Sequence, residues 1–73
     1  MPRRPSLFWD VDPAAIDPVE HSRFVIERIM DFGNDDEVRW MWQVYPKEEL
    51  HRVATLPRGV HPRSKPLWTA LTV

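Results

Sequence analysis

The stretch DPVEHSRFVIERIMDF at Asp17–Phe32 decides the fold, because its apolar residues recur at helical spacing. Asp17 followed by Pro18 is typical of a helix N-cap and the first helical position. Glu20 stands three residues after Asp17, as in a capping box. We therefore expect an amphipathic helix from Pro18 to Phe32. Its apolar residues are Val25, Ile26, Ile29, Met30 and Phe32, with Phe24 beside them.

A second helix is expected directly downstream. Gly33-Asn34 predicts that the first helix ends in a left-handed residue, and Asp35 or Asp36 can cap the next one. The residues that follow form two adjacent apolar stripes, so this second helix is expected to lie centrally, between neighbours. One stripe consists of Val38, Met41, Trp42 and Tyr45, and the other of Trp40 and Val44.

Two shorter helices complete the predicted bundle. Pro46 is expected to begin a third helix, which ends before Pro57 and Gly59. Ser64 can cap a final short helix. The segment Leu7–Trp9 is too short for a helix and is interpreted as an extended clamp across the bundle. The inward-facing residues of the last two helices are Leu50, Val53 and Ala54, and Leu67, Trp68 and Leu71.

Chain length and composition limit the core. A chain of 73 residues forms one domain that buries only about 60% of the surface exposed by its unfolded chain. It has no cysteine, so its aromatic residues, four tryptophans among them, are expected to fill the core. The predicted fold is all-α, a small single-domain bundle of three to five short helices with an extended N-terminal segment. One helical domain spans 1–73, with a flexible arm at 1–6, which carries Arg3 and Arg4, and a basic loop at 56–65.

Charge is distributed unevenly along the chain, although the net charge is only −1. Residues 1–37 carry four Arg against nine Asp or Glu, a net charge of −5. Residues 38–73 carry six Lys or Arg against two Glu, a net charge of +4, and no acidic residue follows Glu49. Such asymmetry between the halves of a chain indicates an interaction surface.

No residue pattern indicates catalysis or metal binding. His21, His51 and His61 share no helical face with a second strong ligand, and the serines stand in no triad-like arrangement. The two glycines form no phosphate loop. We therefore expect a protein that is not an enzyme and that has no cofactor and no metal site. No apolar stretch approaches the ~20 residues of a membrane span, which predicts a cytoplasmic protein without membrane contact.

The strongest functional signal is a run of basic residues on and after the third helix. The candidate partner-binding or nucleic-acid-binding residues are Arg52, Arg58, Arg63 and Lys65, with His51 and His61 among them. This run can meet phosphates or an acidic protein surface. A solvated loop without a binding function is the alternative.

Four pieces of the chain are LFWDVD at Leu7–Asp12, HSRFVIERIMDFG at His21–Gly33, VRWMWQVY at Val38–Tyr45 and KPLW at Lys65–Trp68. In these pieces the chain resembles a family of small uncharacterised bacterial proteins with a tryptophan-rich helical pattern. Members are similar to products often encoded beside abortive-infection-type nucleotidyltransferase toxins, which implies an antitoxin or toxin-regulating role. After Leu56 the chain departs from this pattern, and several prolines stiffen its loop.

Two functions are therefore expected. The first is an antitoxin-like module that binds and regulates a partner toxin enzyme, which the resemblance implies to be a nucleotidyltransferase. The alternative is a small DNA-binding regulator, whose third and fourth helices form a helix-turn-helix and whose basic loop contacts the DNA backbone. So small a core also favours a homodimer, because association buries surface that a monomer leaves wet.

Overall fold

The computed structural model describes residues 7–73, so the predicted arm at 1–6 lies outside the described residues. The described chain is all-α, as predicted, and residues 7–73 contain no strand. No helix in this range is long and apolar enough to cross a membrane. The elements are the 3-10 helix η1 at Pro13–Ala15 and the α-helices α1 at Ser22–Phe32, α2 at Asp35–Val44, α3 at Lys47–Thr55 and α4 at Lys65–Leu71.

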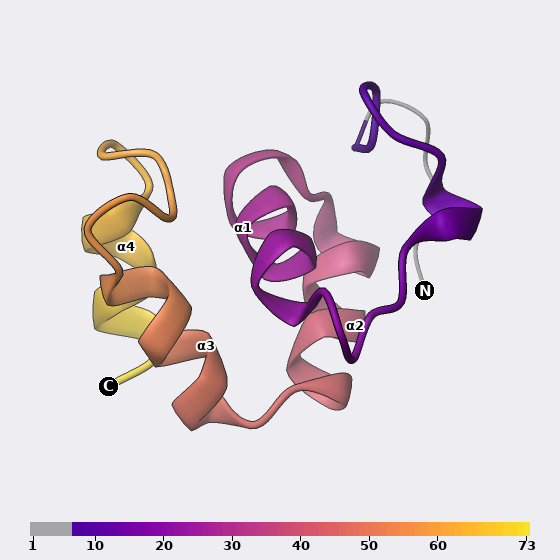
Figure 1. Cartoon of the computed structure of the whole chain (residues 1–73). Helices are drawn as coiled ribbons and strands as arrows, with labels where there is room; N and C mark the ends of the chain where they lie inside the picture. Colours follow the sequence, from indigo (N-terminus) through magenta and orange to yellow (C-terminus); the bar gives the residue numbers. More distant parts are fainter. Residues whose placement is uncertain (1–6) are drawn as a thin grey trace.

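Helix α1 lies at the centre of the bundle. It packs against both α2 and α3, and α4 packs against α3 (Figure 1). The expectation that α2 lies centrally is therefore wrong. Met41 and Tyr45 of α2's two apolar stripes are buried, whereas Trp42 and Val44 are 38% and 45% exposed. Helical spacing indicates which residues share a face, but it does not indicate how many faces meet a neighbour.

The core combines residues from the helices with two residues of the N-terminal segment. Leu7 and Phe8 are buried, in agreement with a segment that lies across the bundle, but residues 7–11 form turns and bends instead of the extended chain that was expected. Each such aliphatic or aromatic side chain contributes about 1.5–3 kcal/mol when it is fully buried. The other buried apolar residues are Val25, Ile26, Ile29, Met30, Met41, Tyr45, Leu50, Val53, Ala54, Val60 and Trp68. All three inward-facing residues predicted for the third helix belong to this core.

Tyr45 ties the end of α2 to the segment before α1. Its hydroxyl donates a hydrogen bond of 2.6 Å to the backbone carbonyl of Pro18. Burial, together with the nearby carboxylates of Glu49 and Asp17, raises the pKa of Tyr45 to about 12. The phenol therefore stays protonated and keeps this hydrogen bond throughout the neutral pH range.

The tryptophans contribute less to the core than expected. Trp68 is buried, and its indole Nε1 donates a 2.9 Å hydrogen bond to the carbonyl of Met30. Trp40 is half-buried against the core, Trp42 lies at its edge, and Trp9 is 59% exposed. The expectation that all the tryptophans of the helices face inward is correct in full only for Trp68.

Helix α4 exposes two leucines that were expected to face the core. Leu67 and Leu71 are 58% and 52% exposed. The reason is that α4 is only 7 residues long and packs mainly on α3, so a single face of it is covered. Trp68 occupies that face.

Helix α1 begins at Ser22, four residues later than predicted. Asp17 does act as a cap, but of the turns that precede the helix. Its Oδ1 accepts the backbone N–H groups of Val19 at 2.8 Å and Glu20 at 3.3 Å. Asp17 is therefore a cap, as predicted, but the residues after it form consecutive turns before the regular helix starts.

The junction between α1 and α2 also differs from the prediction. Gly33 ends α1 with φ −71° and ψ 151°, an extended conformation, so no left-handed residue is present there. Asn34, and not Asp35 or Asp36, caps α2. The Oδ1 of Asn34 accepts the N–H of Glu37 at 3.0 Å, and the Glu37 carboxylate accepts the N–H of Asn34 at 2.8 Å. This capping box satisfies two N–H groups that have no partner within the helix.

Candidate functional site

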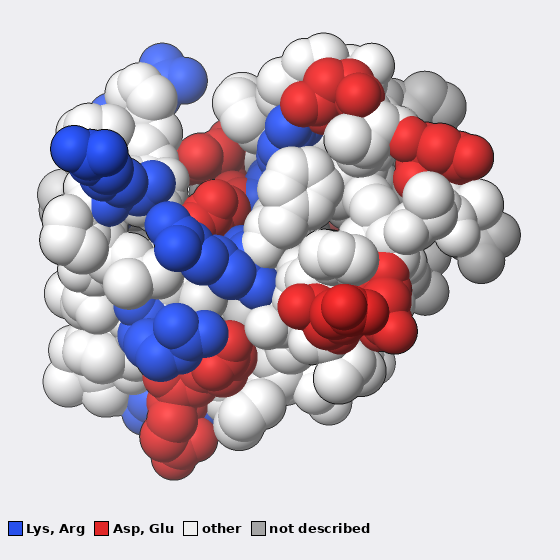
Figure 2. All heavy atoms as spheres, viewed as in Figure 1, with Lys and Arg blue, Asp and Glu red and all other residues white. Residues whose placement is uncertain are grey.

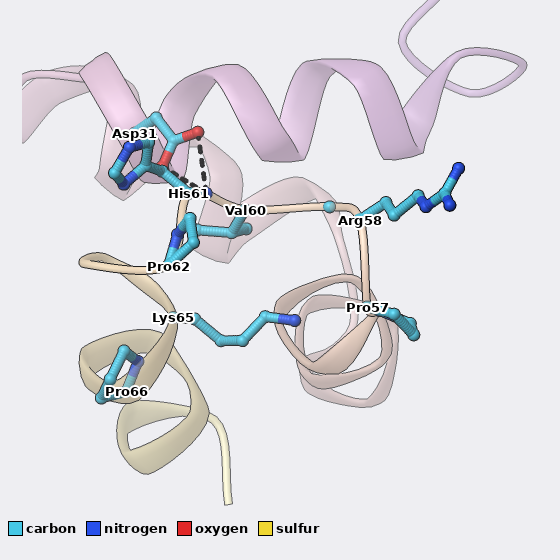
Figure 3. A pocket seen from close by; sticks show the side chains of 9 residues that line it. Asp31, Pro57, Arg58, Val60, His61, Pro62, Lys65 and Pro66 are labelled. Carbon is cyan, nitrogen blue, oxygen red and sulfur yellow. Dashed lines mark hydrogen bonds between the residues drawn. The ribbon is translucent and has the colours of Figure 1, made fainter.

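The basic loop predicted at 56–65 joins α3 to α4 and is anchored to α1 (Figure 3); its last residue, Lys65, is the first residue of α4. Its Val60 side chain is buried in the core. The backbone N–H of His61 donates to both carboxylate oxygens of Asp31 on α1, at 3.1 and 3.3 Å. The middle of this loop is therefore fixed in place by apolar burial and by hydrogen bonds to a carboxylate.

Lys65, one of the four predicted site residues, closes the basic loop. Its side chain runs across the loop towards the end of α3 (Figure 3), where Nζ donates a hydrogen bond to the backbone carbonyl of Leu56. A lysine at the C-terminal end of a helix is stabilised there by the unpaired carbonyl groups of the last turn. The ammonium group of Lys65 thus has a structural partner within the chain.

Arg52, the second predicted residue, is paired on its own helix. Its guanidinium group donates two hydrogen bonds to Glu49, Nη2 to Oε1 at 2.6 Å and Nε to Oε2 at 3.1 Å. The hydrogen bond from Arg52, followed by its charge, holds the pKa of Glu49 below its usual value of 4.5. Ser22 Oγ also donates to Glu49, at 3.2 Å. Arg52 therefore belongs to a network that joins α3 to the start of α1.

Arg58 and Arg63 are exposed on the basic loop. Neither guanidinium group has a carboxylate at ion-pair distance within residues 7–73. Figure 3 shows the side chain of Arg58 extending away from the other side chains of the loop. The four predicted residues therefore do not form one cluster, and only Arg58 and Arg63 present unpaired charge.

A hollow of about 540 Å³ lies beside the basic loop and is open to solvent. Apart from Arg58, the charged and polar side chains that line it already have partners. The Asp31 carboxylate accepts the N–H of His61, the Lys65 ammonium is bound to Leu56, and the His61 ring accepts the N–H of Arg63 at 3.2 Å. The geometry consequently favours contact with the outside of this loop over a ligand held in the hollow.

A second group of side chains, the aromatic clamp of Trp9, Phe24, Arg28 and Phe32, holds the N-terminal segment against α1. The Arg28 guanidinium lies 4.2 Å from the centre of the Trp9 ring and 4.8 Å from that of Phe24. The rings of Trp9 and Phe32 meet edge to face at 5.2 Å. A cation sandwiched between two aromatic rings is attracted to both by their quadrupoles.

Arg28 also forms polar contacts with the N-terminal segment. It donates hydrogen bonds to the Asp10 carboxylate at 2.6 Å and to the Leu7 carbonyl at 3.3 Å. The hydrogen bond from Arg28 lowers the pKa of Asp10 from its usual value of 3.8. The aromatic clamp therefore fixes the direction in which the segment leaves the core and leaves the Trp9 ring exposed.

Sequence reasoning missed Arg28 and Asp31, the two α1 residues that hold the flanking segments. Arg28 had a readable signal, because Phe24 and Phe32 stand four residues before and after it and so share its helical face. Asp31 had none, because its partner is the backbone of His61, thirty residues away. Neighbouring stripes of α1 thus hold the N-terminal segment and the basic loop.

Acidic and basic side chains gather on different parts of one face of the molecule. Figure 2 shows most of the basic groups over α3, α4 and the basic loop, and most of the acidic groups over the N-terminal segment and α1, with a few basic groups over α1 as well. Some acidic groups also lie at the beginning of α3. Across residues 7–73, no three His, Asp or Glu side chains are close enough together to hold a metal ion.

The fold and this surface define a small all-α domain with an anchored, arginine-bearing loop between its last two helices. The model of a family of unknown function, DUF6922, matches residues 3–54, so the chain belongs to that family. The matched residues include the aromatic clamp and Arg52, whereas Arg58, Arg63 and Lys65 lie beyond them. No curated protein and no solved structure matches the chain significantly.

Proposed function

We propose that this protein is an antitoxin-like protein-binding module that docks on a partner enzyme through Arg58 and Arg63. The observation that carries the proposal is that both guanidinium groups are exposed and lack a carboxylate partner in the described chain. Guanidinium groups bind carboxylates with two parallel hydrogen bonds. The matching partner surface is therefore acidic.

The fixed shape of the basic loop supports this proposal. Burial of Val60, the Asp31–His61 hydrogen bonds and the Lys65–Leu56 contact hold the loop at three points. A loop that is ordered before binding loses less conformational entropy when a partner docks. Arg58 and Arg63 are thus presented on a scaffold that is already in place.

The toxin-regulating part of the proposal has a separate basis, the resemblance in four pieces of the sequence. By that resemblance, the partner is a nucleotidyltransferase toxin encoded beside this protein. In the proposed complex, the module covers or distorts the toxin's active site by docking on an acidic surface next to it. Catalysis by the module itself is not required.

Co-elution with the product of the adjacent gene tests the proposal. At micromolar concentrations, the two purified proteins are expected to elute together in size-exclusion chromatography. Charge reversal by Arg58→Glu with Arg63→Glu should weaken binding by about tenfold or more, since like charges then face each other across the interface. Isothermal titration calorimetry measures the change.

Arg39→Glu is the matched control. Arg39 is an exposed arginine on α2, 4.0 Å from Asp36, and does not belong to the basic loop. Its reversal changes the net charge in the same direction but should leave the affinity within about twofold of wild type. Failure of the wild-type pair to co-elute, or equal losses from the loop and control variants, would contradict the proposed docking site.

DNA binding is the rival function for the same two arginines. Residues 56–64 separate α3 from α4, whereas a helix-turn-helix has a turn of about 3–4 residues. The exposed side of α4 carries Leu67 and Leu71 instead of basic groups. If the protein does bind duplex DNA, the affinity falls steeply with salt and also falls in the variant with Arg58→Ala and Arg63→Ala. An electrophoretic shift assay at two salt concentrations separates the two functions.

A further inference from the structure

A second set of unpaired charges, opposite in sign to the basic loop, lies in the segment before α1. Asp12, Asp17 and Glu20 are exposed, and none has a Lys or Arg at ion-pair distance within residues 7–73. The carboxylates of Asp12 and Asp17 accept only backbone N–H groups, from Ala14 and from the two residues that follow Pro18. These three residues are called the acidic segment below.

The acidic segment and the basic loop lie on opposite sides of the central helix. In Figure 1 the segment before α1 runs along one side of the bundle and the loop before α4 along the other. Figure 2 shows that both colours of charge are nonetheless visible on the same face. Arg58 and Arg63 form no ion pair with the acidic segment of their own chain, whereas a second molecule can meet both charged sets at once.

Two copies related by a two-fold axis can bring each charged set against the oppositely charged set of the other copy. If two copies meet through this face and the axis runs in the interface between the two charged sets, each acidic segment faces the basic loop of the other copy. Such an isologous contact uses the same surface twice and closes on itself. Apolar groups accompany both sets, because Val19 is 80% exposed beside Asp17 and Glu20, and Pro57 and Pro62 adjoin the arginines.

We propose that the protein forms a symmetric dimer in which Asp12, Asp17 and Glu20 of one copy pair with Arg58 and Arg63 of the other. Exposed ion pairs are individually weak, about 0–1 kcal/mol each, so the dimer is in exchange with the monomer and is sensitive to salt. A second copy is the occupant of the charged face because it carries both complementary sets, each placed opposite its counterpart when the two copies are related by a two-fold axis.

The dimer has a regulatory consequence that rests on the proposed function. It covers the two arginines through which the partner enzyme docks. Self-association and partner binding then compete, and only the monomer is free to bind. When the protein accumulates without its partner, more of it is therefore dimeric. In the dimer the two arginines do not bind acidic surfaces of other proteins.

Sedimentation velocity of the full chain, alone, tests the dimer. From about 5 to 500 μM protein in about 0.05 M salt, the weight-average sedimentation coefficient is expected to rise from the monomer value towards the dimer value. In about 0.5 M salt it should stay near the monomer value over the same range. A monomer at every concentration in low salt would overturn the proposal.

Charge variants identify the surface. Arg58→Glu with Arg63→Glu, and separately Asp17→Asn with Glu20→Lys, are each expected to weaken the dimer by about tenfold or more. Asn at position 17 retains the side-chain oxygen that caps the turn, so the second variant keeps the local fold. A mixture of the two variants should recover part of the lost association, because the new charges are complementary between them.

Two controls complete the design. Arg39→Glu changes an exposed arginine outside both sets and should leave dimerisation unchanged. Leu71→Glu tests the exposed side of α4, and a dimer that resists salt and both charge variants but dissociates with Leu71→Glu would overturn the proposed interface. Because the partner enzyme is absent from these measurements, loss of the dimer and failure of the proposed function are observed independently.

Discussion

Gly33 is required because a side chain at this position would collide with α1. A Cβ atom there would lie 2.6 Å from the carbonyl oxygen of Ile29 and 2.8 Å from its Cγ2 atom. The backbone carbonyl has little freedom to move, since it belongs to the last turns of the helix. We expect Gly33→Ala to lower the free energy of unfolding by about 1–3 kcal/mol, as overpacking does elsewhere. Urea unfolding followed by circular dichroism measures it.

Gly59 provides the comparison for that variant. The closest atoms to its Cβ would be the Val53 carbonyl oxygen at 3.0 Å and Glu27 Oε1 at 3.2 Å. The Glu27 carboxylate is the end of a flexible side chain and can move aside. Gly59→Ala should therefore cost less than Gly33→Ala. Equal losses for the two variants would argue that loss of glycine itself, and not contact with Ile29, sets the effect at Gly33.

Trp68 combines burial with a hydrogen bond at the end of another helix. Its Nε1 donates to the carbonyl of Met30, in the last turn of α1, where carbonyl groups have no partner along the helix. Trp68→Phe keeps an aromatic ring but removes this donor, so we expect a loss of about 1–3 kcal/mol in unfolding free energy. Trp42→Phe, at a ring 38% exposed, should cost clearly less. If urea unfolding showed a larger loss for Trp42→Phe than for Trp68→Phe, Trp42 would be the more important of the two rings for stability.

At the scale of elements, the start of α2 depends on one asparagine. Asn34 and Glu37 exchange two hydrogen bonds across the first turn. Asn34→Ala is expected to lower the free energy of unfolding by about 1 kcal/mol, within the 0.5–2 kcal/mol range for N-caps. Asp35→Ala should cost less, because Asp35 only adds charge near the positive end of the helix. If Asp35→Ala proved the more destabilising in thermal melts, the capping box would not control this helix end.

The positions of the helices could be predicted from the sequence, but the faces they bury could not. Pro46 correctly placed the start of α3, and its inward residues are buried as expected. The prediction failed for Leu67, Leu71 and Trp42, whose exposure depends on which neighbours the tertiary arrangement supplies. Periodicity is a property of one segment, whereas burial is a property of two.

The candidate site was predictable only in part, for similar reasons. That Arg58 and Arg63 lie on a loop follows from the surrounding prolines and glycine. The pairing of Arg52 with Glu49 could have been read from their spacing of three residues. Lys65 is different, because its contact with the Leu56 carbonyl exists only once the loop has closed. Local pairs are thus accessible to sequence reasoning, and contacts made by loop closure are not.

For the whole molecule, two carboxylates make stability fall in acid. Hydrogen bonds from arginine lower the pKa of Asp10 below 3.8 and that of Glu49 below 4.5 in the folded protein. On acidification the unfolded chain therefore binds protons before the folded one does. The contribution of these groups is complete above about pH 5.5 and is lost as the pH falls through the folded pKa values. Urea unfolding at about pH 6, 4 and 3 should show this decline.

The variant with Asp10→Asn and Glu49→Gln is the control for that decline. It removes both titrating groups, so its unfolding free energy should vary less between about pH 6 and 3 than that of the wild type. Neutralising the exposed Asp35 and Glu48 instead, which have no ion-pair partner within residues 7–73, should leave the slope nearly unchanged. An unaltered slope in the first variant would assign the acid sensitivity to other groups.

The central position of α1 determines the order in which the helices are expected to unfold. Because α2, α3, the N-terminal segment and the basic loop all pack on α1, most of the core is lost when α1 unfolds. Amide hydrogens of Val25–Met30 should therefore exchange with deuterium only through global unfolding, and more slowly than those of α4. Faster exchange in α1 than in α4 would contradict this order. Separation of α1 from its neighbours is therefore expected to coincide with global unfolding, whereas α4 can open while the rest of the chain stays folded.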